Sequence, residues 1–470
     1  MKHKFNFITI LFCYCFLHIF LSLNQPFTMS RRRHSVQRYI PNNSPPFTGE
    51  SLEPHHSEAE RLQISSSSRE QIVAYINKAI SSLITSPDQH VSRDFSLYTG
   101  TGGICYLFLH LTGIFKNSEE ISSQYLAWAE RYYQDAQVGL ERSIEKGGRS
   151  ADRISFVTGK TGVYGMGVLL GALKGDTAMV DECTSAIVEM KDMVVQGNQD
   201  NEILYGRAGY LYSLLWGRRY AGAEKVPDSV IAEVVDKLFE EGQVFDEFEG
   251  ILMYSWHNKL YFGGAHGVTG ILTMVLSALE TLHGIDDLRK AIQAQPSGQR
   301  SQLEEQLALI QATVEYLISQ MNERGNLPSR ADAPERSVDD ELVQWCHGAP
   351  GMVQTLIAAY HVFEEPRYLE YADAAARCIW EKGILTKGNS LCHGTGGNAY
   401  NFLQLYQVTD NSEYLYYAQQ FALACISDDV KRFQRTPDRP LSLFEGLAGE
   451  LFFLSDISFR PLEGKFPCVF

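Results

Sequence analysis

Two kinds of apolar pattern alternate along the chain. In the first, apolar residues recur at alternating spacings of four and three with charges on the other faces, as from Leu303 to Met321 and from Leu369 to Ile379. This spacing is typical of amphipathic helices that bury one face. In the second, runs such as 268–279 and 352–360 are apolar nearly all round. These runs predict inner helices, and the amphipathic segments predict outer helices that alternate with them. The first outer helix is expected over residues 69–84.

A Gly-x-x-Gly motif precedes each inner run and repeats at intervals of roughly fifty residues, with one wider gap. We expect each motif to be the point where the chain turns into an inner helix, because a missing Cβ permits positive φ and close backbone approach. The seven motifs are Gly100/Gly103, Gly159/Gly162, Gly206/Gly209, Gly264/Gly267, Gly348/Gly351, Gly394/Gly397 and Gly446/Gly449.

Amphipathic hairpins cannot bury their inner faces alone, and closing seven of them into a ring buries every inner face. The predicted fold is therefore an all-α toroid, an α/α barrel of seven helical hairpins with the Gly-x-x-Gly turns at one end. Seven apolar segments also match the number of spans in a seven-helix membrane receptor. Most of these segments, however, are interrupted by Gly, Thr, Tyr, His or a charge well before about 18 residues.

A Cys-His-Gly triplet occurs twice, with Cys346-His347 in the fifth repeat and Cys392-His393 in the sixth. Equivalent positions of neighbouring repeats lie close together in a ring, and thiolate and imidazole are ligands that suit zinc. Either cysteine alone would be interpreted as a buried structural thiol, but the duplication favours a metal site. A closed site with both histidines and an open site with one of them both fit the pattern.

Three other titratable residues fall at the same end of the predicted barrel. His266 lies within the fourth motif, where it is either a hydrogen-bonded core or cap residue or a proton donor that faces the metal pocket. Glu202 precedes Gly206 by four residues, and Glu445 directly precedes Gly446. Each of the two carboxylates could equally interact with a helix N-terminus.

The composition of the chain argues against one class of function and indicates a cellular compartment. A net charge of −15 and a pI near 5.4 argue against a nucleic-acid-binding surface. The nine cysteines are scattered and odd in number, which indicates reduced thiols in a cytoplasmic protein and no disulfide framework. At 470 residues, a closed ring of repeats predicts one large domain after an N-terminal tail.

The two ends of the chain differ from the predicted ring of repeats. Phe5 to Leu23 is an apolar run, so residues 1–28 are either a signal peptide or anchor, which would associate the protein with a membrane, or an upstream extension absent from the mature protein. Residues 29–68 are expected to form a disordered polar tail. The toroid is expected over residues 69–458, followed by a C-terminal tail over residues 459–470.

Together the motifs resemble the lanthionine synthetase C-like (LanC-like) family. The resemblance rests on Trp-Cys-His-Gly-Ala-Pro-Gly, Leu-Cys-His-Gly-Thr-Gly-Gly and Gly-Gly-Ala-His-Gly, covers about residues 69–458, and is to the eukaryotic branch, with the tail indicating a plant member. It implies a zinc ion held by Cys346, Cys392 and His393, with a fourth position open to water or a thiol. In bacterial members that thiol is a peptide cysteine. Eukaryotic members bind glutathione, which is thought to be added to dehydroalanine or dehydrobutyrine residues in proteins.

The resemblance also assigns roles around the zinc. His266 matches the catalytic histidine, and Lys387 matches a lysine that lies beside the bound thiol, which makes it a catalytic and glutathione-binding candidate. Glu202, a third catalytic candidate, stands where the bacterial cyclases have Asp, and Leu342 stands where they have Arg. These two departures argue against peptide cyclisation and leave thiol activation in place.

We therefore expect a zinc-dependent glutathione transferase that forms thioethers on dehydroamino acids. The alternative is a protein that binds zinc and glutathione and signals through partners without turnover, and a conjugated product would separate the two. A third candidate, a protein prenyltransferase β-type subunit, has an Asp-Cys-His set in a six-hairpin barrel. It disagrees with seven repeats and two metal-site cysteines.

Overall fold

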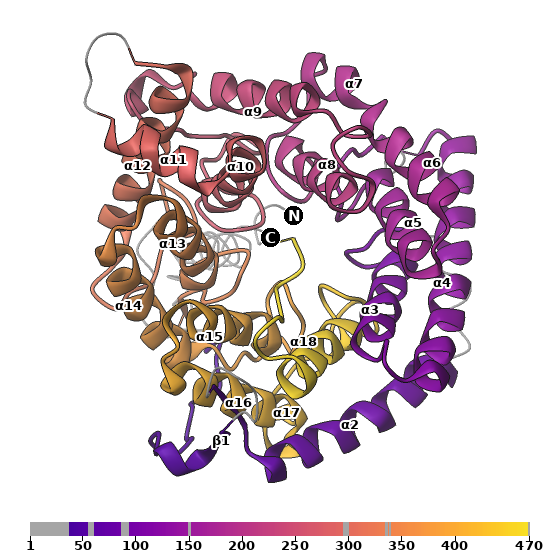
Figure 1. Cartoon of the computed structure of the whole chain (residues 1–470). Helices are drawn as coiled ribbons and strands as arrows, with labels where there is room; N and C mark the ends of the chain where they lie inside the picture. The colour runs from indigo at the N-terminus through magenta and orange to yellow at the C-terminus, as the bar shows by residue number, and fades with distance from the viewer. Residues whose placement is uncertain are drawn as a thin grey trace, which may run out of the picture. The chain divides into compact units, whose positions relative to one another are not determined.

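Inner and outer helices alternate along the chain and form two concentric rings (Figure 1). Each inner helix contacts the inner helices of the repeats before and after it, and the last, α18, contacts the first, α3, so the ring closes. The computed structural model describes residues 37–54, 61–85, 94–148, 152–294, 300–333, 337 and 340–468.

Within these residues there are seven helices of each kind. The inner helices are α3 (Thr101–Ile114), α5 (Lys160–Lys174), α8 (Arg207–Ala221), α10 (Val268–His283), α13 (Ala349–Phe363), α15 (Thr395–Thr409) and α18 (Leu447–Phe459). The outer helices are α2 (Ser66–Thr85), α4 (Glu119–Glu145), α6 (Thr177–Val188), α9 (Asp228–Gly242), α12 (Gln302–Gln320), α14 (Pro366–Lys382) and α16 (Ser412–Ile426). The short elements are η1 (Gly49–Ser51), β1 (Leu52–Pro54), β2 (Leu62–Ile64), α7 (Lys191–Gln196), η3 (Asp246–Phe248), α11 (Ile285–Gln293) and α17 (Asp428–Lys431).

The burial of the helices follows their sequence patterns. In the outer helix α12, Leu307, Ile310, Val314 and Leu317 are buried on one face, and a capping box formed by Ser301 begins the helix. In the inner helix α10, buried residues follow one another with almost no gap from its first residue. The predicted all-α toroid of seven hairpins is thus confirmed.

The register of the fourth motif was predicted wrongly. Gly267, and not Gly264, is the N-cap of α10, so the pair equivalent to the others is Gly267/Gly270. A Cβ on Gly270 would meet the carbonyl oxygen of Gly264, just as one on Gly397 would meet that of Leu391. Gly264/Gly267 and Gly267/Gly270 both match the Gly-x-x-Gly motif in the sequence. Only the close contact of the second glycine with the carbonyl six residues earlier shows which pair is equivalent to the others.

The conformational reason expected for these glycines also differs. Among the N-cap glycines of the described inner helices, only Gly348 has positive φ, at 114°. Gly394 and the other N-caps are extended, with φ −127° at Gly394. These positions exclude a Cβ because the backbone passes too close, and not because an L-residue could not adopt their φ.

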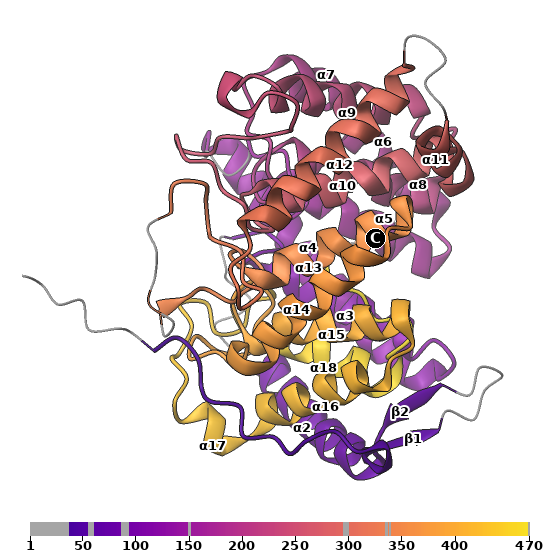
Figure 2. The same ribbon diagram turned by 90° about the vertical axis from the view of Figure 1, so that its left-hand side faces the viewer.

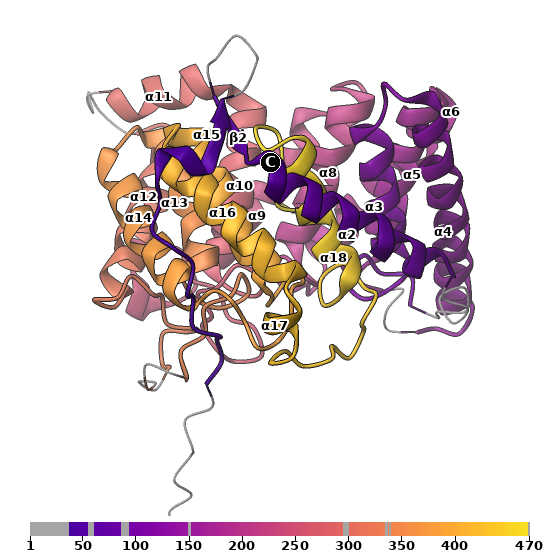
Figure 3. The same ribbon diagram turned by 90° about the horizontal axis from the view of Figure 1, so that it is seen from below.

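The predicted disordered tail over residues 29–68 is wrong for residues 37–54 and 61–68. Residues 37–54 run along the outside of α14 and α16 (Figure 3). The Ile40 N–H donates to the Ile384 carbonyl at 2.7 Å, and Phe47 packs on Tyr416 with ring centroids 5.4 Å apart. β1 and β2 pair antiparallel beside α16 (Figure 2). The segment is ordered because scattered apolar residues, which show no helical period, bind it to the barrel.

The C-terminal segment enters the centre of the ring (Figure 1). Phe466 is fully buried and packs on Trp345, with ring centroids 5.0 Å apart. At the base of this segment, the buried carboxylate of Asp456 accepts hydrogen bonds from His110 at 2.8 Å and from Arg460 at 2.7 Å. The last residues therefore complete the barrel core behind the Cys-His-Gly turns.

In the part of the chain that the structure describes, no single helix is long and apolar enough to cross a membrane. Taken together, the bent pair α10 and α11 is long and apolar enough to cross one, but α10 is one of the buried inner helices. The apolar run from Phe5 to Leu23, on which the membrane association was predicted, lies outside the described residues.

Candidate functional site

Backbone hydrogen bonds join five consecutive repeats of the ring at the residue two positions before the N-cap glycine. The Cys346 N–H donates to the Cys392 carbonyl at 3.4 Å, the Cys392 N–H to Phe444 at 2.9 Å, the Phe444 N–H to Tyr98 at 3.1 Å and the Tyr98 N–H to Val157 at 2.9 Å. The two cysteines hold the same phase in neighbouring repeats. This hydrogen bonding therefore brings them side by side.

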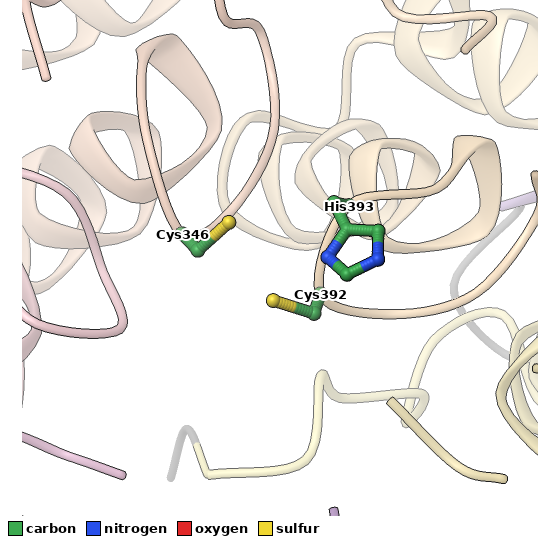
Figure 4. A group of neighbouring side chains, drawn as sticks. All are labelled: Cys346, Cys392 and His393. Atoms are coloured by element: carbon green, nitrogen blue, oxygen red, sulfur yellow. The ribbon is translucent and has the colours of Figure 1, made fainter. Parts of the chain in front are cut away.

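Cys346, Cys392 and His393 form a group whose ligand atoms all lie within 4.8 Å of one another. Both sulfurs and a ring nitrogen of His393 face a common space (Figure 4). In a tetrahedral zinc site, with Zn–S about 2.3 Å and Zn–N about 2.0 Å, ligand atoms lie roughly 3.5–3.8 Å apart. The three side chains fit such a site after a small closing movement, and their donor set is the one zinc prefers.

Each sulfur also receives a hydrogen bond from outside this group. The Gln344 side-chain amide donates to Cys346 Sγ at 3.1 Å, and the Tyr98 hydroxyl hydrogen-bonds to Cys392. The hydrogen bond from Cys392 holds the pKa of Cys346 well below its ordinary value, against the effect of burial, and His393 adds to this shift. Burial and the neighbouring Cys346 raise the pKa of Cys392. The thiol of one cysteine thus stabilises a thiolate on the other through their hydrogen bond.

His347 is not part of this group. Among the described residues, only His393 is close enough to both sulfurs to complete it. The His347 ring instead lies against Tyr261, with ring centroids 5.6 Å apart, and its charge when protonated lowers the pKa of Cys346. Of the two arrangements left open by the sequence, the geometry agrees with the open, three-ligand one.

His266 directly precedes the N-cap glycine of α10, the same phase that His347 and His393 hold in their repeats. Its Nδ1 lies 2.9 Å from Glu202 Oε2. A carboxylate can only accept, so Nδ1 donates and Nε2 is left for other partners. Burial raises the pKa of Glu202, while the hydrogen bond from His266 opposes that rise. The structure therefore brings two of the three catalytic candidates together as a hydrogen-bonded pair.

Two aromatic rings lie parallel to the His266 ring. Trp256 stacks on it with centroids 3.8 Å apart and an interplanar angle of 7°, and Tyr205 lies parallel to it at 5.9 Å. Trp256 begins a tight turn in which His257 and Asn258 have φ of 49° and 58°, as in a type I′ turn. The imidazole is thus fixed by one carboxylate and a stacked indole.

Sequence reasoning missed three of these contact residues. Tyr98 has the same phase as Cys346, and Tyr205 has the same phase as His266, so comparing the seven repeats position by position would have found both. Trp256 lies in the irregular segment before α10 and carries no periodic signal. Its role depends on a turn that the sequence does not reveal.

Lys387 and Glu445 occupy other parts of the same rim. Lys387 is half-buried in the segment between α14 and α15, close enough to Cys392 for its charge to oppose the rise in the pKa of that thiol, which burial causes. Glu445 is half-buried directly before α18, and its N–H donates to the Ser442 hydroxyl at 3.3 Å. Lys387 is therefore placed to attract an anion to the cysteine pair.

Comparisons with known proteins agree with the architecture. Residues 91–469 match the family described as lanthionine synthetase C-like protein. The chain is 32% identical over 386 residues to the Danio rerio protein named Glutathione S-transferase LANCL1, a match that covers 80% of this chain and 85% of the relative. Nisin cyclase, a solved structure, superimposes with a TM-score of 0.57 at 15% identity, covering 84% of this chain and 95% of its own. At that identity the likeness to nisin cyclase shows the fold alone. The plant origin stays a prediction.

Proposed function

Because the chain belongs to the lanthionine synthetase C-like family, we propose that it binds one zinc ion and glutathione and adds the glutathione to dehydroalanine or dehydrobutyrine residues in proteins. The name of the Danio rerio relative, a glutathione S-transferase, supports this choice of thiol. The proposal includes a cytoplasmic location, which the reduced, buried thiols support.

One observation carries the proposal: a thiol-binding group and a proton donor lie at the same end of the barrel. Cys346, Cys392 and His393 would hold the zinc ion. When bound, zinc would lower the pKa of an incoming thiol and stabilise its thiolate. Directly before the N-cap glycine of α10, His266 is oriented by Glu202 at 2.9 Å. Thiol addition to an activated double bond needs both functions in one pocket.

The addition itself is balanced without an oxidant or a leaving group. The glutathione thiol releases its proton to water, its sulfur forms a bond to the β-carbon of the dehydroamino acid, and the π electrons of the double bond move to the α-carbon and its carbonyl. The resulting enolate takes one proton at the α-carbon, for which protonated His266 Nε2 is the proposed donor. The proton released by the thiol restores the protonated His266 for the next turnover. Glu202 compensates the charge of the protonated ring and keeps Nε2 turned away from itself.

Lys387 is proposed to bind glutathione. Its ammonium group is close enough to influence Cys392, and it would attract the thiolate or a carboxylate of the tripeptide. This role is electrostatic, so it affects binding of the thiol and not the proton transfer.

The test is addition of glutathione to a peptide that contains dehydroalanine, with zinc-loaded protein and with the adduct measured by mass spectrometry. Cys392→Ala should abolish both zinc binding and adduct formation. Cys425→Ala, which removes another fully buried thiol on α16, is the matched control and should keep both. A protein that binds zinc and glutathione and yet forms no adduct would contradict the proposal and favour the non-catalytic alternative.

A further inference from the structure

A cavity of about 340 Å³ opens on the Gly-x-x-Gly end of the barrel; we call it the rim cavity. Its volume is at the lower end of the range of small-ligand sites, about 300–1,000 Å³, so it would take a short stretch of chain and not a folded surface. It is lined by Asp94, Phe95, Ser96, Tyr98, Thr99, Ser143, Arg153, Thr158 and Tyr205.

Two walls of the rim cavity are shared with the two halves of the site. Tyr98 hydrogen-bonds to Cys392. Tyr205 stacks parallel to His266, and its N–H donates to Glu202 Oε1 at 2.6 Å. The cavity therefore adjoins both the cysteine pair and the proton donor, and it lies next to the place that the double bond of an electrophile must occupy during thiol addition.

Arg153 gives the rim cavity its charge. Its guanidinium lies over the Tyr205 ring, 4.7 Å from the centroid, and within the described ranges it forms no ion pair. The carboxylate of Asp94, also in the cavity wall, already accepts hydrogen bonds from the Ser96 N–H at 2.9 Å and from the Thr99 hydroxyl at 2.5 Å. The Asp94 carboxylate is thus held by neighbouring groups of the wall, and Arg153 is the cation that the wall offers to a ligand.

The position of Arg153 separates it from the proposed glutathione site. Lys387 lies in the segment between α14 and α15, whereas Arg153 lies in the segment before α5, and α18 and α3 lie between α15 and α5 around the inner ring. Two cations on different sides of the rim suit a reaction that joins two chains. Lys387 would take the thiol, which leaves Arg153 for the other reactant.

We propose that the rim cavity binds the electrophilic peptide and that Arg153 pairs with a carboxylate side chain next to the dehydroamino acid. The substrate preference would then be for acidic sequences around the modified residue, even though the protein itself carries a net charge of −15. The identity of this ligand rests on the proposed function.

Direct binding tests this inference without depending on turnover. The probes are three fluorescent peptides in which Ala replaces dehydroalanine and the neighbouring residues are Glu, Gln or Lys, titrated into zinc-loaded protein. The parent should bind the Glu peptide more tightly, and Arg153→Gln should lose that preference, by roughly ten- to a hundredfold as expected for a charge-assisted hydrogen bond. Arg153→Glu should reverse it in favour of a Lys peptide.

The matched control is Arg131→Gln. Arg131 is an exposed arginine on α4 that also lies over an aromatic ring, 5.7 Å from the centroid of Trp128, and its loss should leave the preference unchanged. An equal loss of affinity for the Glu and Gln peptides in Arg153→Gln would mean that Arg153 only supports Tyr205 and would overturn the inference. So would a rise in the KM for glutathione with unchanged peptide binding, because the cavity would then take the thiol. An intact Arg153-dependent preference in a protein that forms no adduct would instead refute the proposed reaction alone.

Discussion

Replacing Glu202 with Gln is expected to remove most of the turnover and leave zinc binding intact. The Glu202 side chain is 2% exposed, and its two oxygens accept three N–H groups: His266 Nδ1 at 2.9 Å, the Leu204 amide at 2.8 Å and the Tyr205 amide at 2.6 Å. A glutamine amide has one acceptor oxygen and one NH2 group. Whichever way it is turned, at least one of the three donors faces another donor.

Glu202→Gln should have two separate effects, a loss of stability and a loss of rate, and the geometry sets the size of each. A buried donor left without an acceptor costs about 1–3 kcal/mol of stability. If the amide oxygen faces His266, the ring keeps its orientation but loses the negative charge that compensates its proton. If the NH2 group faces it, Nδ1 must accept, and the neutral ring carries its only proton on Nε2. Either arrangement weakens the general acid, whose complete loss commonly costs about 10²–10⁴ in rate.

The assay is the rate of glutathione addition to a dehydroalanine peptide for the parent, Glu202→Gln, His266→Ala and the double variant. Glu202 is inferred to act only through His266, so the second substitution should not slow the His266→Ala variant further. Zinc content should stay at one per chain in all four proteins. Glu202→Gln should lower the free energy of unfolding both in the parent and in the His266→Ala variant.

Glu450→Gln is the matched control, because Glu450 is also a buried carboxylate, 7% exposed on α18, with Lys431 at 3.4 Å. It should lose stability without slowing the reaction per folded molecule. If Glu202→Gln slows the His266→Ala variant by the factor seen in the parent, Glu202 acts independently of His266. If the Glu202→Gln variant turns over at the parent rate, the orienting carboxylate is dispensable. Both results refute the reasoning.

Three further predictions concern the metal, the thiol and the core. Metal analysis should find no stoichiometric zinc in Cys392→Ala and full zinc in His347→Ala, because among the described histidines only His393 lies with the two cysteines; the reverse pattern would reassign the ligand. Lys387→Ala should raise the KM for glutathione severalfold with little change in kcat or zinc content, and an unchanged KM would remove it from the thiol site. Asp456→Asn should lower the free energy of unfolding by about 3–5 kcal/mol in denaturant titrations, since it breaks a buried ion cluster. Burial lowers the pKa of His110 in that cluster, so the unfolded chain binds its proton first, and stability should fall as the pH drops below about 6.5. Stability that is flat over this range would contradict that assignment.

The parts of the fold that repeat could be predicted from the sequence. Hydrophobic periodicity and recurring glycines are properties of each repeat, and ring closure follows because no hairpin can bury its inner face alone. The duplicated Cys346 and Cys392 could be placed together by the same logic of equivalent phase. The fourth motif failed because Gly264 and Gly267 fit the spacing as well as Gly267 and Gly270 do, and the choice depends on a backbone contact.

The parts that occur once could not be predicted in this way. Trp256 reaches His266 through a turn with two non-glycine residues at positive φ, which no repeat predicts. Residues 37–54 look like a polar tail because their few apolar side chains have no period, yet they contact α14 and α16. The rim cavity combines side chains from three repeats, so it exists only after the ring has closed.

The buried C-terminal segment has a consequence for the order in which the protein matures. Phe466, which packs on the tryptophan beside Cys346, is synthesised only after all seven hairpins. While it is still inside the ribosome, the hairpins can form but the interior of the ring cannot be filled. Completion of the core therefore waits until the residues after α18 have left the ribosome, and translation products that end before Phe466 would lack the support behind the cysteine pair.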